Sequence, residues 1–200
     1  DGAVAIFDSV GGVEPQSETV WRQADKYNVP RIAYVNKMDR VGADYDNVIV
    51  MMRQKLAANP VAVHMPLGKE ECFEGVIDLI TMKSYRFDEE TMGTRVIEEE
   101  IPEELKDEAL ARREEMLEHI VDFDDELMGM VLEGIDPDPV LIKRAIRSAV
   151  VKIKICPVLC GSSFKNKGIQ QLLNAIIDYL PSPVDRGAIT GTDPVTGEMK

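Results

Sequence analysis

Hydrophobic residues follow two patterns along the 200-residue chain, and the first pattern occupies both ends. There, short continuous apolar runs alternate with segments in which apolar residues recur at helical spacing. This arrangement is typical of buried parallel strands joined by helices. Strands and helices of this kind are expected at residues 3–7, 16–27, 32–35, 44–58, 153–159 and 169–179. The pattern therefore predicts an α/β fold built on a parallel sheet.

The last of these helices has a clear amphipathic spacing, which predicts the side that faces the core. The residues expected to face inward are Leu172, Leu173, Ile176, Ile177 and Leu180. Pro181 and Pro183 follow this set and end the helix, because proline cannot continue it.

The second pattern lies between residues 60 and 152. Four short stretches alternate between apolar and polar residues and are separated by glycines and charged turns, which favours a small antiparallel sheet. They are residues 61–67, 75–80, 83–87 and 95–101. Three helical segments follow, and they begin near Pro102, Asp125 and Pro139, residue types that suit the first turn of a helix. We expect this part to combine a small sheet with helices.

Composition limits the class of protein. With 44% hydrophobic residues the chain can bury a substantial core. No apolar run approaches the roughly 18 to 20 residues that cross a bilayer, and the first residues do not form a signal-peptide pattern. The three cysteines have no paired spacing, which favours a reduced, intracellular protein. Cys156 and Cys160 would stand about 13 Å apart along one strand, too far for a disulfide, so we expect both in the core.

The net charge of −13 is concentrated in one segment. Residues 88–139 contain 20 acidic and 4 basic side chains. An acidic surface repels nucleic acid, so this segment is not expected to bind DNA, whereas it can meet a basic protein surface. An acidic helix face that only aids solubility is the alternative interpretation.

The string Asn36-Lys37-Met38-Asp39 directly follows the apolar run 32–35, and open α/β sheets bind ligands at such strand ends. N-K-x-D in this position is the guanine-reading motif of GTP-binding proteins. The carboxylate of Asp39 can accept hydrogen bonds from N1–H and from the exocyclic amine of guanine, whereas adenine would leave it unpaired at roughly 1 to 3 kcal/mol. Asn36 can serve the other edge of the base and tie the loop to its neighbours through its second donor. The methylenes of Lys37 can lie along the purine face.

A polar turn in which Asp39 or Asp44 caps the next helix is the structural alternative for this string. A second loop makes that alternative less favoured. Residues 160–168, with the sequence Cys-Gly-Ser-Ser-Phe-Lys-Asn-Lys-Gly, also follow an apolar strand directly. The two strand-end loops together predict one ligand site.

Asp8-Ser9-Val10-Gly11 matches D-x-x-G, the magnesium and γ-phosphate signature of GTPases, but we reject this match. It lies too close to the guanine motif, and the 200 residues contain no G-x-x-x-x-G-K-[ST] phosphate loop. The sequence therefore provides no candidate catalytic residue and no metal ligand.

Five stretches together resemble the GTP-binding domain of the bacterial translation elongation factor G family. They are residues 10–19, 36–40, 75–79, 161–168 and 180–185. The resemblance implies that Asn36, Lys37 and Asp39 read the base, and that Ser162 and Ser163 form the loop that closes over it. Many family members have alanine in place of Ser163. Since the family uses a backbone N–H there to reach guanine O6, the extra hydroxyl should matter little.

The resemblance also implies the fold, a partial P-loop GTPase-type parallel sheet with helices on both faces, interrupted by an inserted α+β subdomain called G prime. The implied division is 1–59 for the guanine-motif part, 60–152 for the insertion, 153–183 for the last strand, loop and helix, and 184–200 for a linker and the start of the next domain. A turn between strands is expected at residues 193–197. The abrupt start at Asp1 indicates the carboxyl-proximal part of the domain. The family's phosphate loop, switches and magnesium ligands would then precede it, and the chain alone would not hydrolyse GTP.

In function, the resemblance implies a cytoplasmic, ribosome-dependent GTP hydrolase that binds GTP and GDP with Mg²⁺ and promotes translocation of tRNA and mRNA. Its partners would be the ribosome and the large-subunit stalk protein, the latter through the acidic insertion, with no membrane. One alternative is a related translational GTPase, release factor three or a ribosome protection protein. Another is a stand-alone module that binds a stalk protein. The apolar strand 3–7 would have a bare edge, so the isolated chain is expected to self-associate.

Overall fold

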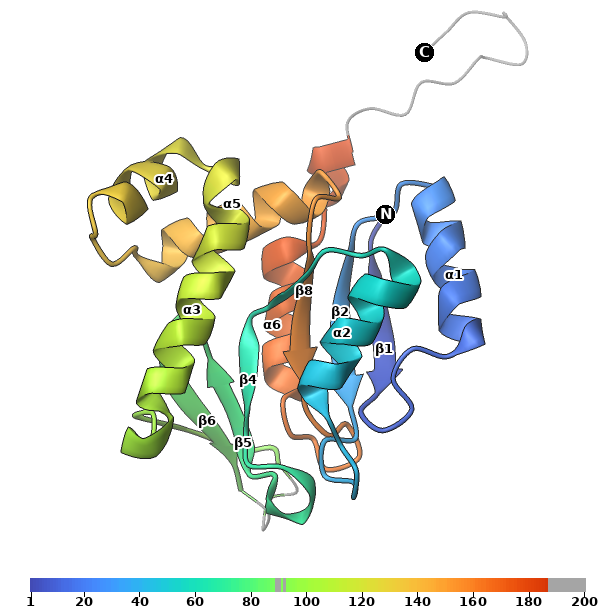
Figure 1. Ribbon diagram of the computed structural model, residues 1–200, viewed down its shortest axis with the longest axis vertical. Coiled ribbons are helices and arrows are strands. Elements are labelled where there is room, and N and C mark those ends of the chain that lie inside the picture. Colours follow the sequence, from blue (N-terminus) through green and yellow to red (C-terminus); the bar gives the residue numbers. More distant parts are fainter. Residues whose placement is uncertain (89–90, 92, 187–200) are drawn as a thin grey trace, which may run out of the picture.

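The computed structural model describes residues 1–88, 91 and 93–186, and within them the chain forms two four-stranded sheets (Figure 1). The first sheet is parallel throughout, with the strand order β1-β2-β8-β3. Its strands are β1 (Ala3–Asp8), β2 (Arg31–Asn36), β3 (Pro60–Ala62) and β8 (Cys156–Cys160). The turn predicted at residues 193–197 lies outside the described residues.

Helices cover both faces of the parallel sheet, as the resemblance implies. They are α1 (Pro15–Lys26) and α2 (Tyr45–Leu56) on one face and α6 (Ile169–Tyr179) on the other. Successive strand residues point to opposite faces. In β2, Ile32 and Tyr34 pack in the core that includes α6, whereas Ala33 and Val35 pack with α1 and α2. All four side chains are buried, which explains the continuous apolar run.

The second sheet is antiparallel, with the strand order β4-β5-β6-β7. Its strands are β4 (His64–Leu67), β5 (Gly75–Asp78), β6 (Lys83–Phe87) and β7 (Val96–Glu99). The helices that follow are α3 (Lys106–Ile120), α4 (Asp125–Leu132) and α5 (Pro139–Val151). Single 3₁₀ turns are η1 (Glu70–Cys72), η2 (Glu103–Leu105), η3 (Val121–Phe123) and η4 (Pro183–Arg186). The small antiparallel sheet and its helices are therefore present.

One predicted strand is divided between the two sheets. Residues 61–67 are predicted as one strand of the antiparallel sheet, yet β3 pairs with β8 in the parallel sheet and β4 pairs with β5. Val63 joins the two sheets, because its N–H donates to the carbonyl of Val158 and its carbonyl accepts from the N–H of Leu79, both at 3.1 Å. Most residues of the stretch 61–67 are apolar, so its periodicity does not distinguish one sheet from the other.

The two sheets share one hydrophobic core. Residues of β2, β8 and α6 pack in the same cluster as residues of β4, β5, α3 and α5. The predicted boundaries at residues 60 and 152 divide this continuous core, and the division into subdomains stays a prediction. Cys156 and Cys160 are free and buried, as predicted, and burial raises the pKa of the Cys156 thiol to about 12.

The inward face of α6 is narrower than predicted. Leu172 is 9% exposed and Ile176 packs against the core, but Leu173 is 55% and Ile177 is 75% exposed. The prediction is wrong for these two residues. Each lies one position beyond an inward-facing residue, about 100° further around the helix, and therefore outside the arc that meets the sheet and α5.

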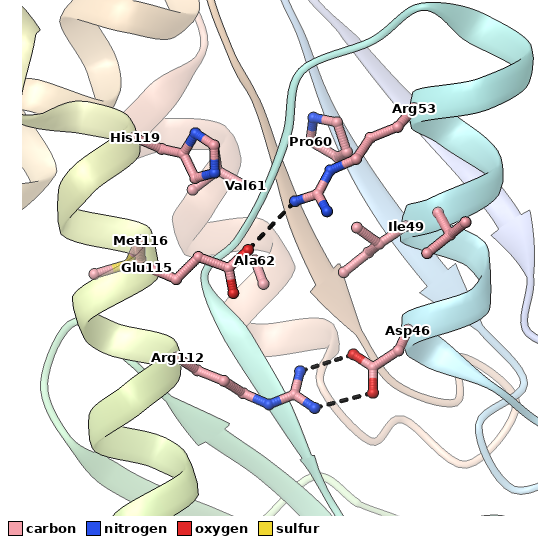
Figure 2. A pocket seen from close by; sticks show the side chains of 11 residues that line it. Asp46, Ile49, Arg53, Pro60, Val61, Ala62, Arg112, Glu115, Met116 and His119 are labelled. Atoms are coloured by element: carbon pink, nitrogen blue, oxygen red, sulfur yellow. Dashed lines mark hydrogen bonds and ion pairs between the residues drawn. The ribbon is translucent and has the colours of Figure 1, made fainter.

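Helices α2 and α3 face each other across a pocket of about 140 Å³ beside β3 (Figure 2). Arg112 of α3 donates two hydrogen bonds to the carboxylate of Asp46 in the first turn of α2, at 2.8 and 2.9 Å. Nη2 of Arg53 lies 3.5 Å from Oε1 of Glu115. Exposed ion pairs contribute about 0 to 1 kcal/mol each, but a two-point contact fixes orientation. The acidic segment therefore packs beside the helix that follows residues 36–44.

Candidate functional site

The two strand-end loops lie side by side at the carboxyl edge of the parallel sheet. Strands β2 and β8 are parallel neighbours, and Val35 lies opposite Cys160. The N–H of Gly161 donates to the carbonyl of Val35 at 3.0 Å, and the N–H of Met38 donates to the carbonyl of Gly161 at 3.1 Å. We call residues 36–44 the first loop and residues 161–168 the second loop. The structure brings all five sequence-predicted site residues together on them.

Asn36 links the two loops through its side-chain carbonyl. Its Oδ1 accepts hydrogen bonds from the N–H of Lys37 at 2.8 Å and from the N–H of Ser163 at 2.9 Å. The sequence interpretation assigns this link to a donor of Asn36, whereas the structure uses the acceptor. The Nδ2 group is thereby the part of the amide suited to donate to a ligand. The N–H of Ser163, which the resemblance assigns to a base, donates to Asn36 here.

Lys37 is held by two residues from the end of β1. Its backbone has a φ of +66°, in the left-handed region that non-glycine residues rarely occupy. Its ammonium lies 2.6 Å from Oδ2 of Asp8, and the hydroxyl of Ser9 donates to its carbonyl at 2.7 Å. The hydrogen bond from Lys37 lowers the pKa of Asp8 to about 2, against the effect of partial burial. N–H groups of the Val10–Gly11 turn add to the shift.

Asp39 is held ionised by the second loop. Burial alone would raise the pKa of its carboxyl group, but hydrogen bonds from Ser162, from its own backbone N–H and from Lys165 lower that pKa overall. Nζ of Lys165 lies 3.3 Å from Oδ2 of Asp39. The carboxylate is 19% exposed and Ser162 is buried. An ionised, partly buried carboxylate at this edge is an acceptor for ligand N–H groups.

The second loop is closed by its own backbone and requires glycine at its start. Ser162 and Lys167 exchange two N–H to carbonyl hydrogen bonds, at 2.9 and 3.0 Å. The hydroxyl of Tyr34 donates to the carbonyl of Lys167 at 3.0 Å. A Cβ at Gly161 would stand 2.2 Å from this carbonyl oxygen and from the Tyr34 hydroxyl, so no other residue fits there without movement. The loop shape thus depends on the strand beneath it.

Sequence reasoning missed three residues that hold the site, namely Asp8, Ser9 and Lys165. Asp8 and Ser9 lie at the end of the neighbouring parallel strand, which is the signal that could have found them. In the sequence they belong to the rejected D-x-x-G match, and in the structure Asp8 anchors Lys37. Lys165 lies in the second loop, and its distance from Asp39 is readable only from the fold.

Metal and membrane signals are absent from the part of the chain that the structure describes. Among residues 1–88, 91 and 93–186, no group of three or more His, Cys, Asp or Glu side chains is arranged to hold a metal ion. Within the same residues, no helix is both long and apolar enough to span a bilayer.

Comparison with known proteins identifies the family. Residues 1–182 match the sequence model of the elongation factor Tu GTP binding domain. The chain belongs to the elongation factor Tu GTP binding domain family. This membership confirms the resemblance to a translational GTP-binding domain that the sequence motifs indicate.

Two relatives of this GTP-binding domain are informative. Elongation factor G of Wolbachia pipientis subsp. Culex pipiens (strain wPip) is 52% identical over 200 residues, which is all of this chain and 29% of that protein. A crystal structure of a protein from Thermus thermophilus matches with a TM-score of 0.82 and 29% identity, covering 98% of this chain and 30% of that one. The chain thus spans about three tenths of the length of these relatives.

Proposed function

We propose that this chain is the guanine-reading part of a ribosome-dependent translational GTPase that promotes translocation of tRNA and mRNA. One observation carries the proposal: Asp39 is held ionised between Ser162 and Lys165, beside Asn36, at the carboxyl edge of a parallel sheet. The family membership and the relative named elongation factor G support it. Release factor three and ribosome protection proteins are the related alternatives.

The base would be read by groups of both loops. The carboxylate of Asp39 accepts from N1–H and from the exocyclic amine of guanine, and adenine offers neither donor at that edge. The Nδ2 of Asn36 donates to an acceptor on the other edge of the base, because its Oδ1 is used between the loops. Lys37, held by Asp8, lays its methylenes along the purine face. Ser162 and Ser163 belong to the loop that would close over the base.

The proposed ligands are GTP and GDP, of which these residues contact only the guanine end. Hydrolysis needs positioned phosphates, Mg²⁺ and a water molecule. The 200 residues contain no phosphate-loop motif that could position these groups. We therefore expect no catalysed GTP hydrolysis by the isolated chain. GTP turnover that copurifies with the chain would contradict this.

The ribosome is the proposed partner, with the large-subunit stalk protein contacting the acidic segment in the cytoplasm. On α3 and the turn before it, Glu104, Asp107 and Glu114 are exposed, and half-exposed Leu110 lies among them as an apolar anchor. Reversing the three charges to lysine should weaken binding of the stalk protein, whereas Asp39→Ala should not. Unchanged binding after charge reversal would exclude this face. If the chain is instead a stand-alone module that binds a stalk protein, charge reversal should weaken that binding in the same way, but the chain should not bind guanine nucleotides.

Competition for bound fluorescent GDP tests the proposed function in the full-length protein. GDP and GTP should displace the probe, and ADP should not, because only guanine satisfies the carboxylate of Asp39. Asp44→Ala, which removes the cap of α2 at Asn47 but no base contact, is the matched control and should keep this preference. Displacement by ADP at the same concentration as GDP would refute guanine recognition.

A further inference from the structure

The turn between β4 and β5 contacts the first loop, although it belongs to the second sheet. This turn comprises η1 and Phe73, and we call residues 70–73 the clasp turn. The N–H of Glu70 donates to the carbonyl of Met38 at 3.1 Å. In return, Oε1 of Glu70 accepts from the N–H of Gly42 at 2.8 Å. One residue of the clasp turn therefore holds the first loop at two points, on either side of Asp39.

The clasp turn also holds the second loop. Nζ of Lys167 donates to the carbonyl of Phe73 at 2.9 Å, and Lys167 is only 4% exposed. Burying an ammonium group costs free energy unless hydrogen bonds compensate. An apolar side chain would fill this space without that cost, so a lysine here favours a positional role over simple packing. Both loops are thus attached to the same turn, the first loop through Glu70 and the second through the carbonyl of Phe73.

The shape of the clasp turn is narrowly defined. Glu70 has a φ of +54°, a left-handed conformation that persists in a non-glycine residue only where the surroundings hold it. Gly68, before the turn, has a φ of +78°, and a Cβ there would lie 1.9 Å from the carbonyl oxygen of Cys72. Phe73 is buried in the same core cluster as Met38. The turn can therefore act as a fixed reference for the loops.

We propose that the clasp turn is a positioning element of the guanine site, and that Glu70 and Lys167 act by holding the two loops in register. Asp39 reads guanine only if its carboxylate and the second loop keep their relative positions, and the clasp turn adds a contact to each loop beyond those that the loops make with each other. Loss of the clasp should speed nucleotide release and weaken the discrimination of guanine from hypoxanthine, which lacks the exocyclic amine that Asp39 binds. This inference rests on the proposed function of the site.

Four variants of the full-length protein test the clasp. Glu70→Ala removes the acceptor for Gly42, and Lys167→Met removes the donor to Phe73 with little change in volume. Glu70→Gln keeps an Oε1 acceptor for the N–H of Gly42 and should therefore retain the nucleotide binding of the unmodified protein. Glu71→Ala is the matched control, because Glu71 is an exposed neighbour of the same charge.

The readouts are the dissociation rate of fluorescent GDP and the ratio of the dissociation constants of inosine diphosphate and GDP. Glu70→Ala and Lys167→Met should raise the release rate by about fivefold to tenfold, as expected for loss of one intramolecular hydrogen bond. Both variants should also lower the ratio of the dissociation constants of inosine diphosphate and GDP, because Asp39 would contact the exocyclic amine of guanine less well. Glu70→Gln and Glu71→Ala should stay within about twofold of the unmodified protein on both readouts.

Unfolding midpoints in urea, measured without nucleotide, separate positioning from a structural role. Two results would overturn the positioning role of the clasp turn. The first is a lower urea midpoint in both Glu70→Ala and Lys167→Met with an unchanged ratio of the dissociation constants of inosine diphosphate and GDP. The second is a GDP release rate in both variants equal to that of Glu71→Ala. Selective binding of GDP over ADP by the unmodified protein tests the proposed function separately. If that selectivity is present, either of these results refutes only the positioning role of the clasp turn. If the selectivity is absent, guanine recognition and the positioning role are both refuted.

Discussion

At the scale of single residues, the side chains assigned to the base are held by side chains from other strands. Asn36, Lys37 and Asp39 are recognisable in the sequence because they are neighbours after one apolar run. Asp8 and Lys165, which contact two of them, lie far away in the chain. The strand order β1-β2-β8 places their loops together, and no spacing in the sequence reveals that order. The motif was therefore predictable, whereas the contacts that Asp8 and Lys165 make with it were not.

Replacing Asp8 with asparagine should lower the free energy of unfolding by an amount that depends on pH. Lys37 lowers the pKa of Asp8 from 3.8 to about 2, so the folded state holds this proton less tightly than the unfolded state does. The stabilisation, up to about 1 kcal/mol for a partly exposed pair, is present above about pH 4 and is lost as the pH falls through about 2. Urea unfolding of both proteins across this range measures it. A difference in unfolding free energy that does not change with pH would contradict the ion pair.

At the scale of elements, hydrophobic spacing predicted the position of most helices and strands but not which sheet or face each residue joins. The stretch 61–67 serves two sheets, because both sheets pack on one core. On α6, the apolar residues extend beyond the arc that the sheet and α5 cover. In both cases tertiary contacts, and not the hydrophobic periodicity, determine which sheet a strand joins and which helix residues are buried. Apolar character alone does not establish burial.

Two alanine substitutions on α6 should separate the buried from the exposed side of the helix. Leu172→Ala should lower the free energy of unfolding by about 2 to 4 kcal/mol, because it leaves a cavity against the core. Ile177→Ala should change it by less than about 0.5 kcal/mol, because Ile177 is 75% exposed. Urea unfolding of both variants measures the difference. Equal losses would mean that α6 packs with a different face.

At the scale of the whole molecule, the two sheets share one core, and among the residues that the structure describes β1 pairs with a strand on one side only. Figure 1 shows β1 at the side of the sheet opposite the antiparallel strands. Ile6 is 62% and Val20 is 65% exposed, and both line an apolar pocket of about 280 Å³ between β1 and α1. An apolar edge strand of this kind is a surface for pairing with another chain.

The isolated 200-residue chain should therefore self-associate through β1. Light scattering should give an average mass above that of the 22.3 kDa monomer, rising with concentration. Ile6→Lys should reduce the association, because a charge on an edge strand opposes pairing. Ile97→Lys, at a 38% exposed position on the other sheet, is the control and should leave it unchanged. A monomeric mass at every concentration would contradict the prediction.

Guanine recognition by Asp39 is the central claim, and a base-specificity swap tests it most directly. Fluorescent guanine nucleotide is bound to the full-length protein and to its Asp39→Asn form, with xanthine nucleotide as competitor. We predict that the variant changes its preference from guanine to xanthine, because an amide can donate where xanthine carries an oxygen. An unchanged preference for guanine would mean that the first loop is only a turn after β2, and that Asp39 does not read the base.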